Sequence, residues 1–457
     1  MKRILYTIPL ILSFLLLWFY LNYLQINKTN ELYNYIPFQA EQVFQFNANH
    51  VFKKIIFERV FHEDAFLKRI PSPERPSIIS GKTGIDFAHP LTIYKMFEDK
   101  GPVWVFMLKV NDKEALQKYI EKSEQIYPTA FNDEAFLVAI PYGPTYEEVK
   151  HKLEQIVSKE IDTYPFMDKL TANLGKDKKD VTFSISNHVK GNLLNIKNIN
   201  GEVKFEEGHV SFESNIEMKS DFKMITTEKV FVLPQKGIHA HGFFEPKDVI
   251  NAVIQDMPLI DRLPATKYFS LNITGFDFQM VSIVEQKFYL IPNIELLVKP
   301  HSLTEYENFI ENLDRDSIIN VDYDKQIIHI NERLAIHFDQ VGDMLYFSTE
   351  GLKKVQLKEE KVEEIVYLTM NIHELVQNIE TEITLIPQQL KDLIHAFNYY
   401  EQLTFSIVED PNEDQKFKGQ GELTFNTASE HSIVELVATL QTVSNLKIVR
   451  DAMSAGQ

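Results

Sequence analysis

Two kinds of hydrophobic periodicity alternate along this chain. Runs in which every second residue is apolar, typical of strands, are followed by a cap residue, a glutamate three positions later and an amphipathic helix. The clearest copy is the run VWVFMLKV at 103–110, which leads to Asn111 and Glu114. Three further copies follow apolar runs at 294–298, 365–370 and 422–426. In such a capping box the cap and the glutamate each satisfy a backbone N–H at the start of a helix, so the pattern predicts strand–helix modules.

Together with two looser copies and the strands between them, these modules give the order β-α-β-β-α-β three times. The expected helices are 48–60 and 112–125 in the first unit, 246–256 and 302–313 in the second, and 371–398 and 428–442 in the third. This is the split βαβ, or ferredoxin-like, order. It predicts an α+β fold in which antiparallel sheets carry helices on one face. The alternative is that the same short elements are arranged in another order.

A chain of 457 residues exceeds the size at which one hydrophobic core usually divides. A strand-rich stretch at 181–233 has glycine turn signals and predicts a β-meander. The predicted segments are 1–30 for a cytoplasmic tip and transmembrane anchor, 31–175 for the first α+β unit, 176–235 for the meander, 236–352 for the second unit and 353–457 for the third.

Residues 4–24 form an uncharged, strongly apolar segment of 21 residues, long enough to cross a bilayer as a helix. Lys2 and Arg3 precede it, and the positive-inside rule then places the N-terminus in the cytoplasm. The alternative is a cleaved signal peptide, but 22–27 (NYLQIN) offers no small-residue cleavage site. We therefore expect a single-pass protein of the cytoplasmic (inner) membrane that contacts the lipid bilayer through residues 4–24, with the bulk of the chain periplasmic or extracytoplasmic.

Charge and cysteine content exclude several classes of function. The formal net charge is −18, and such a surface repels phosphate backbones, so we expect no nucleic acid partner. The chain has no cysteine, which excludes disulfides, thiolate metal sites and a cysteine nucleophile.

Two short stretches carry a family resemblance: 36–40 (IPFQA), which runs into the expected strand VFQFNANHVF, and 83–86 (TGID), which leads to the VWVFMLKV strand. In these motifs the first quarter of the chain resembles a group of uncharacterised bacterial membrane-anchored envelope proteins with an Ile/Leu-Pro-x-x-Ala start. The chain departs from members of the group that carry a lipidated cysteine. The resemblance implies a location in the envelope and no particular activity.

His239 and His241 are the first candidate metal ligands. They flank one residue of an expected strand, so their side chains share a face, and Glu245 and Asp248 follow closely. Two imidazoles and a carboxylate could bind zinc. The alternative, which we favour, is a solvated strand face.

Other motifs fail in their details. Gly81-Lys82-Thr83 resembles the end of a phosphate-binding loop, but Ser77 stands where the first glycine is required. A calcium-like run lacks the glycine and the final glutamate of such a loop, and His373-Glu374 lacks the second histidine of a zinc protease. The residues of the calcium-like run are Asp410, Asn412 and Asp414, and a further acidic run, His62-Glu63-Asp64, is most simply a polar helix end. We therefore predict no catalytic, cofactor-binding or metal-binding residues and no cofactor.

The 33 phenylalanines and 19 tyrosines either form cores or, on an open sheet face, a binding groove. The sequence favours a membrane-tethered, extracytoplasmic protein that is not an enzyme and that binds an envelope protein partner or serves as a scaffold. One alternative is a carrier of lipid or another hydrophobic ligand, which would need an enclosed aromatic pocket. The other is a hydrolase with an unrecognised carboxylate site.

Overall fold

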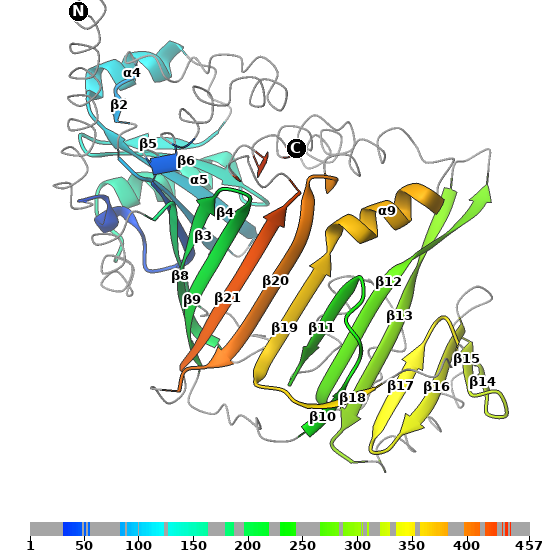
Figure 1. The fold of residues 1–457 in the computed structure, drawn as a ribbon. Helices are drawn as coiled ribbons and strands as arrows, with labels where there is room; N and C mark the ends of the chain where they lie inside the picture. Colours follow the sequence, from blue (N-terminus) through cyan, green and yellow to red (C-terminus); the bar gives the residue numbers. More distant parts are fainter. Residues whose placement is uncertain are drawn as a thin grey trace, which may run out of the picture. The chain divides into compact units, whose positions relative to one another are not determined.

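The fold is taken from a computed structural model of the whole chain (Figure 1). It describes residues 31–47, 50–51, 54, 83–86, 89–98, 100–122, 127–162, 179–186, 196–218, 229–243, 266–282, 287–302, 304, 309, 320–329, 335–351, 357–382, 397–411, 416–426, 432, 435–436 and 439. The chain divides into two compact units: unit 1 is Met1–Phe52 with Glu74–Ile185, and unit 2 is Lys53–Pro73 with Ser186–Gln457.

Unit 1 is built on an antiparallel sheet in which the strands pair in the order β7–β1–β3–β4–β6–β5, while the short β2 pairs with the end of β4. The strands are β1 (Ala40–Phe46), β2 (Ile85–Asp86), β3 (Leu91–Glu98), β4 (Gly101–Val110), β5 (Thr129–Phe131), β6 (Ala135–Pro141) and β7 (Val181–Ser186). The helices are the 3-10 helix η1 (Glu31–Tyr35), α4 (Lys113–Lys122) and α5 (Tyr146–Val157).

The helices α4 and α5 contact opposite faces of this sheet. Leu153 of α5 and Leu32 of η1 pack in one cluster with Leu137 of β6. Leu116 of α4 packs in another cluster with Phe136, the preceding residue of β6. Because successive side chains of a strand point to opposite faces, the faces under α5 and α4 are different ones.

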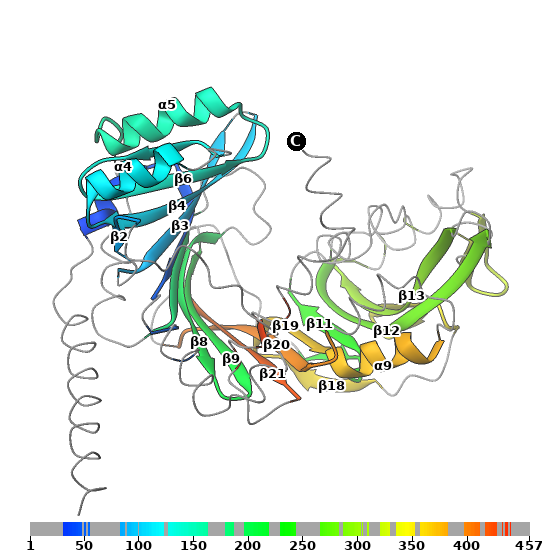
Figure 2. The same cartoon turned by 90° about the horizontal axis from the view of Figure 1, so that it is seen from above.

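Among its described residues, unit 2 contains a large antiparallel sheet with the pairing order β8–β9–β21–β20–β19–β11–β12–β13–β17–β16–β15–β14 (Figure 1). Figure 2 shows that this sheet curves from β9 through β19 to β13. Its strands are β8 (Ile196–Glu206), β9 (His209–Met218), β11 (Ile238–Gly242), β12 (Thr266–Ser282), β13 (Lys287–Pro300), β14 (Asn320–Asp322), β15 (Ile327–His329), β16 (Ala335–Val341), β17 (Met344–Ser348), β19 (Glu364–Asn371), β20 (Tyr400–Glu409) and β21 (Lys416–Phe425).

Each face of the middle of this sheet packs against a different element. On one face a core cluster joins Leu271 of β12 and Leu296 of β13 to Leu375 of α9 (Ile372–Glu382). On the other face Tyr268 and Leu297 pack against a separate two-stranded pair. That pair consists of β10 (Lys229–Val232) and β18 (Lys358–Lys361). In this part of the sheet, β12 and β13 are therefore covered on both faces.

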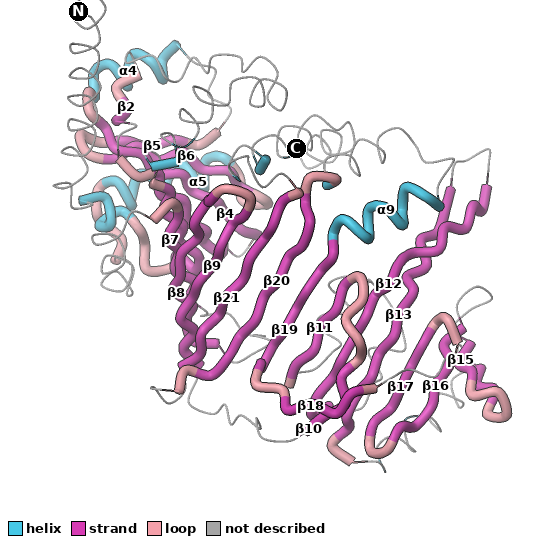
Figure 3. Tube along the Cα trace, in the orientation of Figure 1, coloured by secondary structure: helices cyan, strands magenta, loops and turns pink. Residues whose placement is uncertain are grey.

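The predicted α+β fold of three ferredoxin-like units is wrong. Strand dominates the described residues (Figure 3), and every ladder between named strands is antiparallel. A split βαβ places its first and third strands side by side and parallel, whereas β11, β12 and β13 pair in simple succession. β11 also pairs with β19, so strands assigned to the second and third predicted units belong to one sheet. The helices α4 and α5 contact two faces instead of one.

One local prediction is confirmed in part. The strands that precede the expected boxes after β13 and β21 pair antiparallel with the strands before them, in β12–β13 and β20–β21, and β4 pairs antiparallel with β2 and β3. The stretch expected as a meander contains strands β7 to β10, of which β8 pairs with β9, β7 with β1 and β10 with β18. The expected helices at 48–60, 246–256, 302–313 and 428–442 lie largely outside the described residues.

The localisation predicted from residues 4–24 requires correction. In the part of the chain that the structure describes, no helix is long and apolar enough to cross a membrane. Residues 4–24 themselves lie outside that part. The structure therefore gives no support to the single-pass inner-membrane anchor or to the periplasmic placement that depended on it.

Replacing Gly84 by alanine should destabilise unit 1 by about 2 kcal/mol or more. Gly84 has a φ of +75°, and an added Cβ would lie 2.2 Å from the Asp112 carbonyl oxygen and 2.5 Å from the Leu116 backbone nitrogen, at the start of α4. Gly275→Ala is the matched control, because its Cβ would meet nothing closer than 3.9 Å. Thermal unfolding of both variants tests this, and equal melting temperatures would contradict it.

Candidate functional site

Aromatic side chains gather on the face of the unit 1 sheet that points away from α5. Phe44 lies opposite Phe183 on one side and Ile93 on the other, and Ile93 lies opposite Phe106. Directly opposite residues of antiparallel strands share a face, so these side chains form one row across four strands. We call the set Phe44, Ile93, Trp104, Phe106 and Phe183 the aromatic face.

The aromatic face is packed within itself but stays partly accessible. The Phe44 ring centroid lies 6.4 Å from that of Trp104 and 6.2 Å from that of Phe183. Phe44, Trp104 and Phe106 are half-buried, whereas Phe183 is buried. Lys95 shares this face, and its Nζ lies 5.9 Å from the centroid of the Trp104 ring, within reach of a cation–π contact. The aromatic face therefore combines partly accessible aromatic rings with one cation.

His239 and His241 lie in β11, between β12 and β19 in the middle of the large sheet. Their exposed fractions are 0% and 7%. The interpretation as a solvated strand face is therefore wrong, because β11 is a central strand and the β10–β18 pair packs over this face of its neighbours. The two imidazole rings lie edge to face, with 5.4 Å between their centroids.

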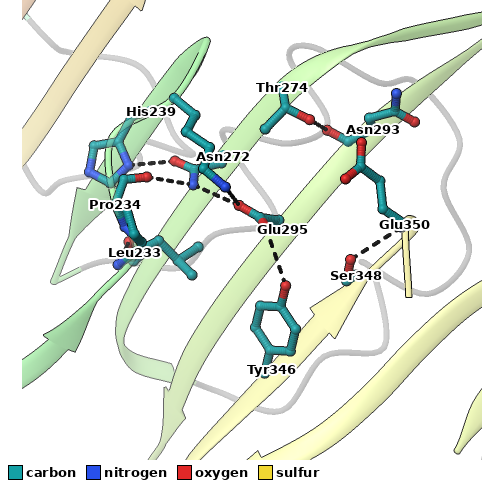
Figure 4. Close-up of polar contacts among 12 residues, drawn as sticks. Leu233, Pro234, His239, Asn272, Thr274, Asn293, Glu295, Tyr346, Ser348 and Glu350 are labelled. Carbon is teal, nitrogen blue, oxygen red and sulfur yellow. Dashed lines mark hydrogen bonds and ion pairs between the residues drawn. The ribbon is translucent and has the colours of Figure 1, made fainter. Parts of the chain in front are cut away.

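The hydrogen bonds around these histidines fix their tautomers. Figure 4 draws the bonds that join His239, Asn272 and Glu295. Asn272 Nδ2 donates to the Pro234 carbonyl oxygen (2.8 Å) and to Glu295 Oε2 (3.0 Å), so Asn272 Oδ1 accepts from His239 Nδ1, 2.7 Å away. A neutral His239 then accepts at Nε2 from His241 Nδ1, at 3.1 Å. His241 Nε2 is then the unprotonated ring nitrogen. It is buried and has no hydrogen-bond partner among the described residues.

Burial keeps both imidazoles neutral. It lowers the pKa of His241 to about 3, with a smaller contribution from the neighbouring His239. Burial also lowers the pKa of His239, against the opposing effect of its hydrogen bond to Asn272. The His241 ring stacks on Tyr367 at 4.9 Å between centroids. A charged imidazolium would lose solvation here without gaining an anionic partner in direct contact.

The far end of the network holds a buried carboxylate. Glu295 is 5% exposed; its Oε1 accepts a long hydrogen bond from the Tyr346 hydroxyl (3.5 Å), and its Oε2 lies 3.6 Å from Lys236 Nζ. Asn272 separates Glu295 from the histidines, and a side-chain amide does not titrate. The network therefore cannot pass a proton from His241 to Glu295 along these bonds, and its evident effect is to satisfy polar groups inside the sheet packing.

The described residues do not assemble a metal site. They contain no group of three or more His, Asp or Glu side chains placed to hold an ion. The carboxylates proposed beside the histidines, Glu245 and Asp248, lie outside the described residues. In the calcium-like run, Asp410 pairs with Lys418 at 3.1 Å, while Asn412 and Asp414 also lie outside them.

The remaining motifs have ordinary structural contacts where they are described. Thr83 is buried, and its Oγ1 accepts from the Ile85 backbone N–H at 3.4 Å. His373 Nε2 lies 2.7 Å from Gln377 Nε2 within α9, and Asn371 caps that helix by accepting from the Glu374 N–H. Gly81, Lys82 and the 62–64 run lie outside the described residues. Sequence reasoning missed the buried partners Asn272, Glu295 and Tyr346, because no local pattern specifies the pairing register that places them beside the histidines.

Comparison with known proteins gives little further information. No family model matches the sequence, and no curated protein matches it. Among solved structures, three crystal forms of TP0453 (IV, III and I) are similar with TM-scores of 0.24, 0.26 and 0.26 and sequence identities of 10%, 9% and 9%. They cover 40%, 62% and 63% of this chain and 79%, 98% and 99% of theirs. TM-scores this low carry no argument about fold or function.

The buried histidines should make the stability of the protein depend on pH. Histidine in the unfolded chain has a pKa near 6.5, and folding lowers that of His241 to about 3. Below about pH 6.5 the unfolded chain therefore binds more protons, and the free energy of unfolding falls as the pH falls. The expected loss from His241 alone is about 2 kcal/mol between pH 7 and pH 5.

Urea unfolding at both pH values tests this expectation. His241→Gln should lose less stability on acidification than the parent protein, whatever its stability at pH 7. His151→Gln, at an exposed position of α5, should behave as the parent. An unchanged pH dependence in His241→Gln would contradict the assignment of a neutral, buried imidazole.

Proposed function

We propose that this chain is a binding protein and not an enzyme, and that a protein partner docks on the aromatic face of unit 1. The observation that carries the proposal is the partial accessibility of Phe44, Trp104 and Phe106 on one face of the sheet. Aromatic side chains are enriched at the centres of protein interfaces, where tryptophan contributes most often to affinity. Lys95 over Trp104 adds a cation at the same surface.

A protein partner fits this surface better than a carried lipid. A carrier would enclose its ligand among aromatic side chains, whereas the aromatic face is a sheet surface. A cavity of about 240 Å³ lies on the α5 side of the same sheet and has no aromatic side chain in its lining, which consists of Met96, Lys100, Val103, Pro144, Glu148, Val149 and Lys152. The hydrolase alternative needs converging carboxylates or histidines that a substrate can reach. The network around His239 is buried, and the amide of Asn272 separates its histidines from the Glu295 carboxylate.

Trp104→Ala should weaken partner binding by about 2 kcal/mol or more, roughly thirtyfold, as for a central interface aromatic. The measurement is affinity capture with the full chain, followed by titration of the recovered protein against parent and variant. Tyr119→Ala is the matched control, since Tyr119 is an exposed aromatic residue of α4 and is not one of the residues that form the aromatic face. Circular dichroism and thermal unfolding verify that both variants fold.

The result expected is a protein captured by the parent and by Tyr119→Ala and lost with Trp104→Ala. A protein captured equally by all three would overturn the assignment of the surface. Lipid recovered with the parent, without any protein that depends on Trp104, would overturn the proposal in favour of the carrier.

A further inference from the structure

A row of buried polar side chains crosses three neighbouring strands of unit 1, directly behind the aromatic face. Gln45 of β1 lies opposite Thr182 of β7 on one side and opposite Thr92 of β3 on the other. Directly opposite residues of antiparallel strands share a face, so these three side chains form one row, which we call the threonine row. The exposed fractions of Gln45, Thr182 and Thr92 are 2%, 3% and 0%.

The threonine row lies on the core side of the sheet. Val43 of β1, two residues before Gln45, belongs to the core cluster that includes Leu32 of η1 and Leu153 of α5. Alternate residues of a strand share a face, so Gln45 points to the same side as this cluster. The hydroxyl of Tyr33 in η1 donates to Gln45 Oε1 at 3.2 Å, which places η1 over this part of the sheet.

Several polar atoms of the threonine row have no hydrogen-bond partner among the described residues. They are Gln45 Nε2 and the Oγ1 atoms of Thr92 and Thr182. The hydroxyl of Tyr94, two residues after Thr92 on the same face, also has no partner among them. Buried polar groups nearly always form hydrogen bonds, because burial without one is costly. A group of neighbouring side chains with this property indicates a bound molecule that bonds to them.

Gln45 is placed to bond in both directions along the row. Its Nε2 carries two N–H donors, and the two threonines flank it on the neighbouring strands. The Cβ atoms of directly opposite residues lie about 4.5–5.5 Å apart, so a molecule as small as water can bridge the amide and either hydroxyl. Water can accept from the amide and bond to a hydroxyl in either sense. The three side chains are neutral, so they would not compensate the charge of a buried ion.

We propose that unit 1 binds internal water at the threonine row, with one molecule between Gln45 Nε2 and Thr92 Oγ1 and another between Gln45 Nε2 and Thr182 Oγ1. These bridges satisfy both N–H groups of the amide and both hydroxyls. Buried waters of this kind typically make two to four hydrogen bonds and are part of the structure. The inference does not depend on the proposed protein partner.

The internal water stabilises the register that assembles the aromatic face. Each residue of the threonine row is the sequence neighbour of a residue of the aromatic face, on the opposite side of the same strand. A slip of one residue between two of these strands would bring polar side chains to the aromatic face and aromatic side chains to the threonine row. Water bonded across three strands therefore favours the observed pairing.

Thr92→Val and Thr182→Val test the proposal, because valine has the shape of threonine without the hydroxyl. If water bonds to the hydroxyl, each change removes a hydrogen bond, and the melting temperature of the full chain should fall by about 3 °C or more. A hydroxyl without any partner predicts the opposite sign, since its replacement by a methyl group removes an unsatisfied buried group. Thr129→Val, at a partly exposed position of β5 in the same sheet, is the matched control and should change the melting temperature by about 1 °C or less.

NMR magnetisation transfer from water to threonine methyl groups gives a second readout on the full parent chain, so it does not require that a valine variant folds. The methyl groups of Thr92 and Thr182 should receive transfer from a long-lived water, and that of Thr129 should not. Absence of this transfer at both buried methyl groups would overturn the internal water. A melting temperature that both valine variants leave unchanged or raise would also overturn it.

Discussion

The structure of unit 2 depends on the register of one antiparallel sheet. Because directly opposite residues share a face, the pairings place Glu295, Asn272 and His239 in one row across β13, β12 and β11. The intervening residues, among them Leu271 and Leu296, then all fall on the opposite, apolar face. A slip of one residue in any ladder would exchange the two sets, so the hydrophobic core and the polar row specify the same register.

The polar row is stable under the β10–β18 pair because its members satisfy one another. Asn272 has both an acceptor and a donor group, and it accepts from a histidine on one side while it donates to a carboxylate and a carbonyl on the other. An isolated glutamate in this position would cost several kcal/mol of desolvation. The one atom that this network leaves bare is His241 Nε2, at the end of the chain of bonds, and the depressed pKa of that ring follows from its burial.

The strands could largely be predicted from sequence, and their partners could not. Apolar alternation located β12, β13, β20 and β21, since that pattern depends only on nearby residues. The pairing of β11 with β19 joins residues around 240 and 368, and no local pattern encodes it. A capped helix after a strand is likewise compatible with many folds. Helix α5 was missed although Thr145 and Glu148 form a complete capping box, because no long apolar strand runs directly into it.

Local sequence patterns do not specify which elements cover a strand. For that reason the sequence could not separate the aromatic face and the cavity from the core. The run VWVFMLKV in β4 is apolar on both faces, as is usual for a strand covered on both sides. In the fold, Val103, Val105 and Met107 are buried beneath α5 and η1, whereas Trp104 and Phe106 remain partly accessible. On the second face of β4, helix α4 packs against Leu108 and Phe136, and Trp104 and Phe106 lie further along the same face. That unequal covering is the physical basis for seeking a partner at Trp104.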